Sequence, residues 1–432
     1  MPLSTTISER VLLSVWLYGR LDSATAVLTA MATLAILFSI AVAQIFLGAA
    51  LLTLLVSRRP IRFPSRLGLA LSAFLGWSLL SLAFSPDVWA GIPQLRKLFL
   101  VLAFVVAYNA YTEPRQVSRT VQAVVVGAVA AALYGLAQFV QAYWRITGEG
   151  LPFYENYVVH QITGFMSHWL TFGGQLMMVL LLAVAAALFG KLSSQLRWAA
   201  WLSAALIALG LLAAFTRGVW LGAFAGLVYL LGRSKPRALW LLPVAALLLY
   251  ILSPSWLQRR TSSLIETAAD SSNQSRVVML WTGLNMIAAN PLLGVGPERV
   301  ATEFLRYKPA AMPLPEAWYG HLHNNYLQLA AERGIPALLF WLWVLFEVFR
   351  ASLILARGTS PEASTLGQAG IAMTVGLMVA GLFEFNFGDS EVMMLYLLLI
   401  AAGYAWTRLE SAAPLRSQEN SAPGLTKLPQ TP

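Results

Sequence analysis

The sequence predicts an all-α integral membrane protein with about twelve transmembrane helices and one large folded loop outside the membrane. Three observations predict this class. Of the 432 residues, 58% are hydrophobic and only 11% are charged, whereas soluble domains carry about 25% charged residues. The apolar residues gather in runs close to the ~20 residues that a helix needs to cross a bilayer. The basic residues lie in short loops between these runs, which is the pattern of positive-inside topology.

The apolar runs give the expected membrane helices in order. The first run, 25–56, is too long for one crossing, so we expect two short helices there. Each later run is expected to form one helix: 68–84, 95–111, 117–143, 169–189, 196–215, 218–231, 238–252, 335–356, 366–385 and 392–406. The total is twelve, which places both termini on the same side of the membrane.

The loop charges indicate which side that is. The five loops on the side of the termini contain twelve Lys or Arg residues and two acidic residues. Two short loops on the other side, "SPDVWAGIPQ" and "FGDSE", contain no Lys or Arg. We therefore expect both termini to be cytoplasmic. The net charge of +10 is explained by this topology, so membrane lipids are expected partners and nucleic acid is not.

The longest polar stretch, 253–334, is expected to be a small folded subdomain on the outer face, between the ninth and tenth helices. Turns rich in Gly, Pro and Asn separate two parts with helical periodicity, 277–289 and 300–305. Tryptophans and apolar helix faces argue against disorder. The expected parts of the chain are membrane helices one to nine (1–252), the outer loop (253–334), membrane helices ten to twelve (335–407) and a disordered cytoplasmic tail (408–432).

Several kinds of chemistry lack their motifs. The chain has no cysteine, so no disulfide or thiolate site can form. It has no phosphate-binding loop, no dinucleotide-binding glycine fingerprint and no G-x-S-x-G nucleophile motif. The segment "HLH" at 321–323 could begin a zinc site, but no cysteine or carboxylate cluster nearby supplies the other ligands. We expect neither a metal nor another cofactor.

Cations and imidazoles remain as candidates on the outer face, where all four histidines fall. His323 is the first candidate, because histidine is the usual general base near neutral pH. Arg217, in "FTRGVW", and Arg276, in "SRVVML", offer planar, permanently charged donors that suit phosphate oxygens. Each also has a simpler explanation. His323 could be a structural histidine, Arg217 an arginine that extends to the membrane interface, and Arg276 a loop arginine in a surface ion pair.

Other residues are weaker candidates. Arg96 and Lys97 lie on the outer side against the positive-inside rule, so they either extend to the interface or serve the site. His321 and His168 are expected to support the site.

The remaining polar candidates follow the histidine pair. Asn324 either orients His323 or a ligand, or caps the following helix. Glu332 is a second candidate base. A structural role, as a partner of Arg333 or of a loop amide, is the favoured interpretation of this residue.

Three segments together resemble the O-antigen ligase family, whose superfamily includes O-antigen polymerases and protein O-oligosaccharyltransferases. They are "TRGVW", "SRVVMLWTGLNMIAANPLLGVGPE" and "HLHNNYLQLAAERGIPALLFWLWV". The resemblance covers about 164–387. One departure is "TRG", where many members have Ser-Arg-Gly.

The resemblance implies a metal-independent, inverting glycosyltransferase of the GT-C-like type in the bacterial inner membrane, with a periplasmic active site. Its donor would be a polysaccharide on undecaprenyl pyrophosphate, and its acceptor a sugar hydroxyl of lipid A-core. By motif position, the catalytic histidine falls on His323 and the two essential arginines on Arg217 and Arg276. An O-antigen polymerase or a protein O-oligosaccharyltransferase is the near alternative, and a multi-span transporter the remote one.

Overall fold

The computed structural model describes residues 3–262, 271–315 and 320–421, and these residues form helices and connecting segments without a strand. The all-α prediction is therefore confirmed. The helices, with 3₁₀ helices marked η, are α1 (Leu3–Ala35), α2 (Ile40–Val56), α3 (Ser65–Ala83), α4 (Val88–Gly91), η1 (Ile92–Lys97), α5 (Leu98–Ala110), α6 (Pro114–Gly148), α7 (Phe153–Tyr157), α8 (Trp169–Phe189), α9 (Ser194–Ala213), α10 (Arg217–Ser234), η2 (Pro236–Trp240), α11 (Leu241–Leu252), α12 (Ser255–Ser262), α13 (Ser271–Ala289), α14 (Val300–Tyr307), α15 (Asn325–Ala356), α16 (Pro361–Ala380), η3 (Asn386–Gly388) and α17 (Ser390–Ser421).

Each of the eleven apolar runs overlaps a helix, and run 25–56 is divided between α1 and α2 as expected. Among the described residues, eight helical stretches are long and apolar enough to cross a membrane. The protein is thus a multi-pass membrane protein. Some predicted bounds were wrong. Run 95–111 is part 3₁₀ helix and part α5, α11 has only 12 residues, and α17 continues to Ser421, where a disordered tail was expected.

The helices α8, α16 and α17 form the inner layer of the bundle. In α8, 83% of the most apolar stretch of the helix is buried inside the protein, whereas in α3 the share is 28%. Close packing of α10 on α16 depends on glycine: a Cβ on Gly222 would lie 2.5 Å from the carbonyl oxygen of Gly376. Small residues at such crossings let helix backbones approach closely inside membranes.

The helix α15 begins at Asn325, ten residues before the predicted run, and it is broken at Gly334 (φ 82°). Pro336 has no N–H, so it cannot bond the carbonyl of Glu332 in the usual helical way. The outer loop supplies the missing donors: the amide of Val295 donates to the carbonyl oxygen of Ala331 at 2.8 Å, and that of Gly296 to Glu332 at 3.0 Å. The first segment of α15 is thereby fastened to the outer loop.

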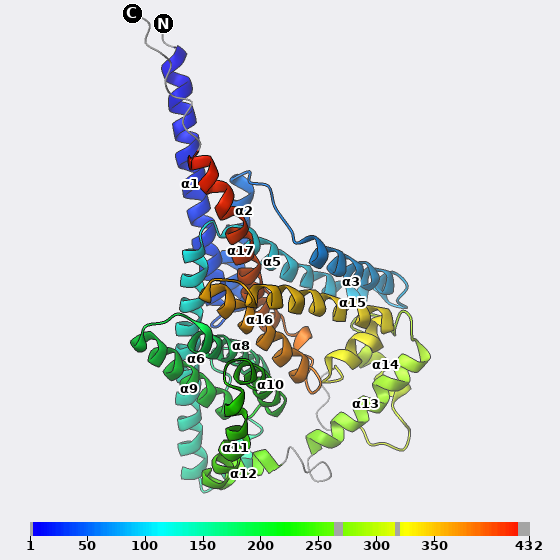
Figure 1. Cartoon of the computed structure of the whole chain (residues 1–432). Coiled ribbons are helices and arrows are strands. Elements are labelled where there is room, and N and C mark those ends of the chain that lie inside the picture. Colours follow the sequence, from blue (N-terminus) through cyan, green and yellow to red (C-terminus); the bar gives the residue numbers. More distant parts are fainter. Residues whose placement is uncertain (1–2, 263–270, 316–319, 422–432) are drawn as a thin grey trace, which may run out of the picture.

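The outer loop is folded over its described residues. The helices α13 and α14 pack against the start of α15 around a separate hydrophobic cluster, which includes Met286, Val300, Phe304 and Leu322. Figure 1 shows α13 and α14 beside the N-terminal end of α15, away from α1 and α2. Residues 263–270 and 316–319 of the predicted subdomain lie outside the described residues.

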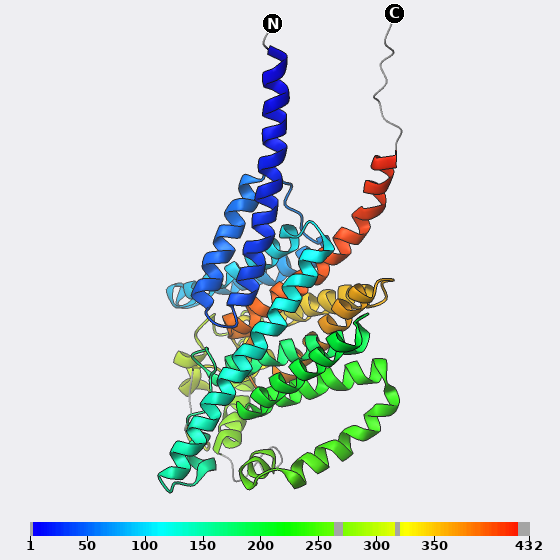
Figure 2. The same cartoon turned by 90° about the vertical axis from the view of Figure 1, so that its left-hand side faces the viewer.

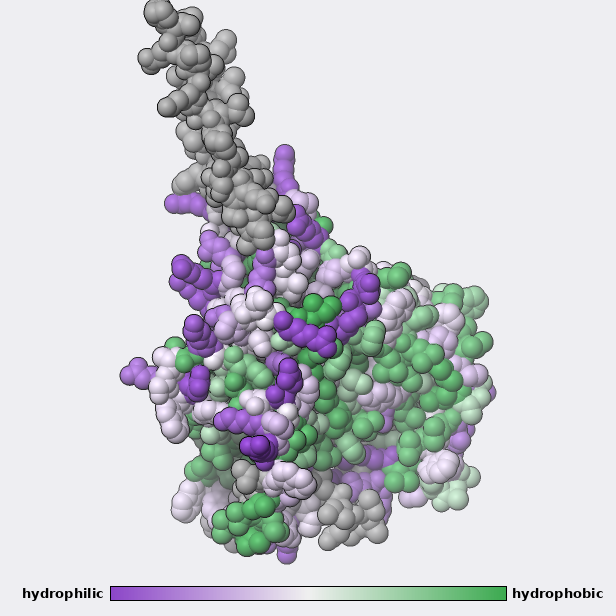
Figure 3. Space-filling view, in the orientation of Figure 1, coloured by the Kyte–Doolittle hydropathy of each residue, from purple (hydrophilic) through white to green (hydrophobic). Residues whose placement is uncertain are grey.

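The two ends of the chain emerge on the same side of the molecule, because α1 starts there and α17 runs toward it, as Figures 1 and 2 both show. Figure 3 shows apolar residues covering much of the face over α3 and α15, and hydrophilic residues gathered nearer α1. This distribution suits a bundle surrounded by lipid on its sides.

Candidate active site

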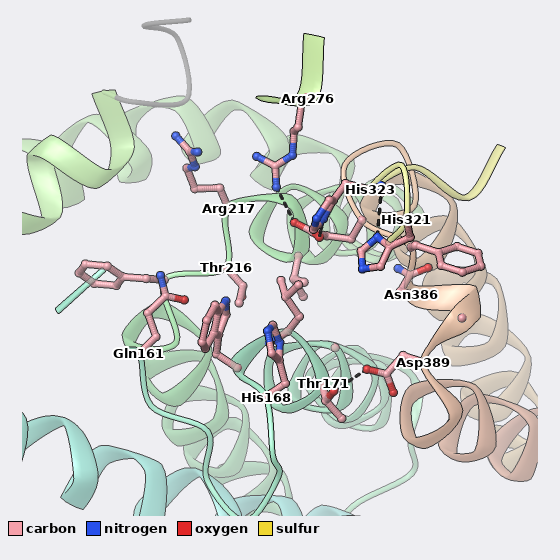
Figure 4. Close-up of a pocket in the computed structure, with 18 of the residues that line it drawn as sticks. Gln161, His168, Thr171, Thr216, Arg217, Arg276, His321, His323, Asn386 and Asp389 are labelled. Atoms are coloured by element: carbon pink, nitrogen blue, oxygen red, sulfur yellow. Dashed lines mark hydrogen bonds and ion pairs between the residues drawn. The ribbon is translucent and has the colours of Figure 1, made fainter. Parts of the chain in front are cut away.

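A cavity of about 1250 Å³ lies between the bundle and the outer loop. It collects side chains from segments far apart in the sequence, and Figure 4 shows several of them pointing toward the same space. The charged and imidazole residues that line it are Lys97, His168, Arg217, Arg259, Arg260, Arg276, Glu298, His321, His323, Glu332, Glu384 and Asp389.

At one wall of this cavity, the Glu384 carboxylate connects two of the predicted residues. Its Oε2 lies 3.0 Å from Nδ1 of His323, and its Oε1 lies 2.7 Å from Nη2 of Arg276. The Glu384 side chain is only 6% exposed. Burial alone would raise the pKa of Glu384, but the hydrogen bond with His323 and the charge of Arg276 together hold it below its usual value.

The ionised Glu384 determines how His323 is protonated. A carboxylate can only accept hydrogen bonds, so Nδ1 of His323 must carry the proton that points to it. In the neutral ring this leaves Nε2 as the basic nitrogen. The residue also has a left-handed backbone, φ 47°, a conformation that is uncommon outside glycine and that clusters at functional sites. This arrangement would let the neutral ring of His323 accept a proton at Nε2.

His321 lies beside His323, with the two ring centres 4.2 Å apart. Its Nδ1 accepts a hydrogen bond from the backbone N–H of His323 at 3.4 Å. Burial, reinforced by the nearby His323, lowers the pKa of His321 to about 4. It is consequently neutral at pH 7, which fits a supporting residue.

Arg217 is the first residue of α10 and is 6% exposed. Its Nη2 donates to Oδ1 of Asn273, on α13, at 3.3 Å. The start of α10 packs tightly on the Glu384 segment, since a Cβ on Gly218 would lie 2.8 Å from Phe383. Arg217 thus lines the same cavity as Arg276, which is 59 positions away in the sequence, and its side chain is buried.

The weaker candidates are placed as follows. Lys97 lines the cavity, and its Nζ donates to the carbonyl oxygen of Gly388 at 3.1 Å. His168 caps α8 by accepting from the backbone N–H of Leu170 at 3.1 Å, and burial lowers its pKa. The side chain of Arg96 lies outside the described residues.

The contacts of Asn324 include a helix cap, and those of Glu332 include a hydrogen bond from a loop amide. Asn324 caps α15, with its Oδ1 accepting from the N–H of Leu327 at 2.9 Å. Glu332 is 1% exposed, and its Oε1 accepts from Nε2 of Gln328 at 2.9 Å and from the N–H of Glu298 at 3.2 Å.

Sequence reasoning missed Glu384, Arg259 and Arg260. Glu384 was hidden in the predicted membrane run 366–385, although a carboxylate at the end of an apolar run is itself a signal. The structure ends α16 at Ala380 and turns the chain so that Glu384 faces His323. Arg260 fixes the turn before Arg217, because its guanidinium donates to the carbonyl oxygen of Phe215 at 2.6 and 3.0 Å.

Three oxygen atoms of cavity-lining side chains are buried without a hydrogen-bond partner among the described residues: Oγ1 of Thr216, Oε1 of Gln161 and Oε2 of Glu332. An unsatisfied buried polar atom costs about 1–3 kcal/mol, so a polar ligand that reaches them would be stabilised. Over the described part of the chain, no three His, Asp or Glu side chains are grouped as a metal ion requires.

The fold and cavity define a multi-pass α-helical membrane protein with a cationic, histidine-bearing site beneath a folded loop. Residues 202–342 match the family described as O-antigen ligase. The chain therefore carries an O-antigen ligase domain, and the resemblance noted from the motifs is confirmed. The match includes Arg217, Arg276 and His323, and it ends before Glu384. No curated protein matches the chain.

This match supports an O-antigen ligase- or polymerase-type function in general. The family is one of membrane glycosyltransferase-like ligases, whose substrates are lipid-linked polysaccharides.

Proposed function

We propose that this protein is an O-antigen ligase of the inner membrane. It transfers a polysaccharide from undecaprenyl pyrophosphate to a sugar hydroxyl of lipid A-core, on the periplasmic side, in lipopolysaccharide biosynthesis. The observation that carries the proposal is the Glu384 carboxylate, which joins the imidazole of His323 to the guanidinium of Arg276 in one cavity.

The reaction needs a base for the acceptor hydroxyl. In the proposed step, Nε2 of His323 removes the hydroxyl proton while the acceptor oxygen attacks the anomeric carbon of the donor sugar. Glu384 stabilises the imidazolium that forms, because its oxygen accepts the hydrogen bond from Nδ1. The proton then passes from His323 to water, and the base is restored.

The leaving group needs fixed positive charge. As the new glycosidic bond forms, the bond between the anomeric carbon and the phosphate oxygen breaks, and its electron pair leaves on undecaprenyl pyrophosphate. Attack from the opposite face inverts the anomeric centre. Arg217 and Arg276 stabilise the developing phosphate charge, as preorganised donors do in many group transfers.

The size and polarity of the cavity suit these substrates. A volume of about 1250 Å³ exceeds an ordinary small-molecule pocket of roughly 300–1,000 Å³, so two sugar-bearing substrates have room to meet. The buried oxygens of Thr216 and Gln161 can receive sugar hydroxyls. The energy is supplied by the activated donor lipid, so no nucleotide is required.

The test is a transfer reaction with purified protein in lipid nanodiscs, defined undecaprenyl-pyrophosphate oligosaccharide and purified lipid A-core, in excess EDTA. We expect a product with the sugar linked to lipid A-core and with inverted anomeric configuration. Extension of a second lipid-linked repeat unit, with no transfer to lipid A-core, would identify a polymerase instead. Loss of activity in EDTA, with recovery on adding a divalent ion, would refute the metal-independent mechanism.

A further inference from the structure

A second cavity, of about 420 Å³, lies at the other ends of the helices that reach the active site. It is lined by residues of α5, α15, α16 and α17 and of the segment between α2 and α3. Asp389, just before α17, lines the large cavity, whereas Arg408 lines this one. At 1.5 Å per residue they are about 28 Å apart along the helix. Figure 2 shows α17 leading away toward the end where α1 starts.

Three arginines from separate segments line this second cavity: Arg62, Arg350 and Arg408. Arg350 pairs with Glu347 at 2.8 Å, and none of the described residues that line the cavity is acidic. Three guanidinium groups against one neighbouring carboxylate leave a net positive charge. An anionic ligand would therefore be attracted to this position.

The arginines are placed by specific contacts. Nη2 of Arg408 donates to the carbonyl oxygens of Tyr108, at 3.1 Å, and Tyr111, at 2.6 Å. The backbone N–H and C=O of Arg62 both bond the side-chain amide of Asn109, each at 2.9 Å. The Arg62 segment is thus fastened to the end of α5. The Arg408 guanidinium and the backbone at Arg62 are therefore held in place at this cavity.

The rest of the lining is apolar, with a few hydroxyl groups. Leu355, Leu366, Leu399 and Ile400 contribute hydrocarbon surface. A site lined by both arginines and aliphatic side chains suits a ligand that joins a phosphate to a hydrocarbon chain. Basic pockets between transmembrane helices bind anionic lipid headgroups in this way.

We propose that this cavity binds one anionic phospholipid, with its phosphate between Arg62 and Arg408 and an acyl chain against Leu366 and Ile400. The site is separate from the donor site, since the two cavities share no lining residue. The bound lipid would hold the α2–α3 segment, α15 and α17 together at this end of the bundle.

The test is lipid binding by the full chain in detergent, measured by native mass spectrometry with phosphatidylglycerol and, in parallel, phosphatidylcholine. We expect phosphatidylglycerol to bind at least tenfold more tightly. Arg62→Gln and Arg408→Gln should each weaken its binding roughly fivefold. Arg62→Gln keeps the backbone bonds to Asn109, so its folding is not in question. The matched control is Arg357→Gln, which removes an exposed arginine after α15 that does not line the cavity.

Soluble glycerol phosphate separates a lipid site from a free phosphate site. Weak or absent competition by glycerol phosphate supports the lipid, and competition at equal concentration overturns it. Equal binding of the two lipids, or equal weakening by Arg357→Gln and Arg62→Gln, also overturns the proposal. None of these readouts depends on sugar transfer, so the proposed ligase activity and this site can fail independently.

Discussion

Glu384 accepts a hydrogen bond from Nδ1 of His323 at 3.0 Å although the two residues are 61 positions apart. The contact crosses from the end of the outer loop to the turn after α16. It sets which nitrogen of the imidazole is basic, and Arg276 is attached to the same carboxylate. The proposed chemistry therefore depends on Glu384 as much as on the motif residues.

Glu384→Gln should slow transfer roughly 100-fold or more while the protein stays folded in the membrane. The amide keeps the shape of the carboxylate but cannot stabilise the imidazolium or hold Arg276, and general-base catalysis contributes about 10²- to 10⁴-fold. The measurement is the single-turnover rate. Glu332→Gln is the comparison, because Glu332 is the other fully buried acid in the cavity wall. A large loss in Glu332→Gln alone would move the base to that residue.

Arg217→Lys and Arg276→Lys should each reduce transfer, because lysine keeps the charge but loses the planar pair of donors. Losing such a contact in a partly dry site costs about 2–4 kcal/mol, or tens- to a thousandfold in rate. In the proposed mechanism both arginines act on one pyrophosphate, so the double variant should be non-additive. Donor affinity and turnover are measured for all three.

The control for the arginines is Arg306→Lys, since the side chain of Arg306 is 73% exposed on α14. It should behave as wild type. Near-normal donor affinity and turnover at Arg217→Lys or Arg276→Lys would remove that arginine from the site.

Stability should fall as the pH is lowered from 7 to 5, in part because of His321. Its folded pKa, about 4, lies below the unfolded value of about 6.5. Between these values the unfolded chain binds more protons, so the free energy of unfolding decreases as the pH falls. The loss for this group alone is about 2 kcal/mol between pH 7 and pH 5. Thermal unfolding of wild type and His321→Gln at several pH values should show a shallower dependence in the variant. Identical slopes would contradict a buried neutral His321.

Gly334→Ala should disrupt the attachment of α15 to the outer loop. Its φ of 82° disfavours any side chain, and a Cβ there would lie 1.8 Å from the carbonyl oxygen of Leu292. We expect a loss of more than about 2 kcal/mol in stability together with loss of transfer. Gly76→Ala is the control, because nothing lies within 4 Å of its Cβ position. Equal melting temperatures for the two variants would refute the role of the break.

The sequence predicted the helices well because a membrane helix must contain a long apolar run, and such runs can be read directly. It predicted the start of α15 poorly. The segment from Asn325 to Arg333 is polar on its cavity side, so hydropathy excluded it from the run. Its helical form depends on Val295 and Gly296, which donate to the carbonyls that the break leaves unpaired. That contact is tertiary, and no local pattern shows it.

The site was predictable where a motif marks it, as at His323, Arg217 and Arg276. Glu384 was not, because its partners come from two distant segments and it lies at the end of an apolar run. Asn324 caps α15, and its Nδ2 also donates to the carbonyl oxygen of Leu382 at 3.0 Å.

The most direct measurement of the central claim is the single-turnover transfer rate of His323→Gln, alongside its affinity for the donor lipid. Glutamine still donates a hydrogen bond to Glu384 but cannot act as a base near neutral pH. The account predicts a rate lower by about 10²- to 10⁴-fold, with donor affinity within about threefold of wild type. Transfer above a tenth of the wild-type rate would contradict His323 as the base.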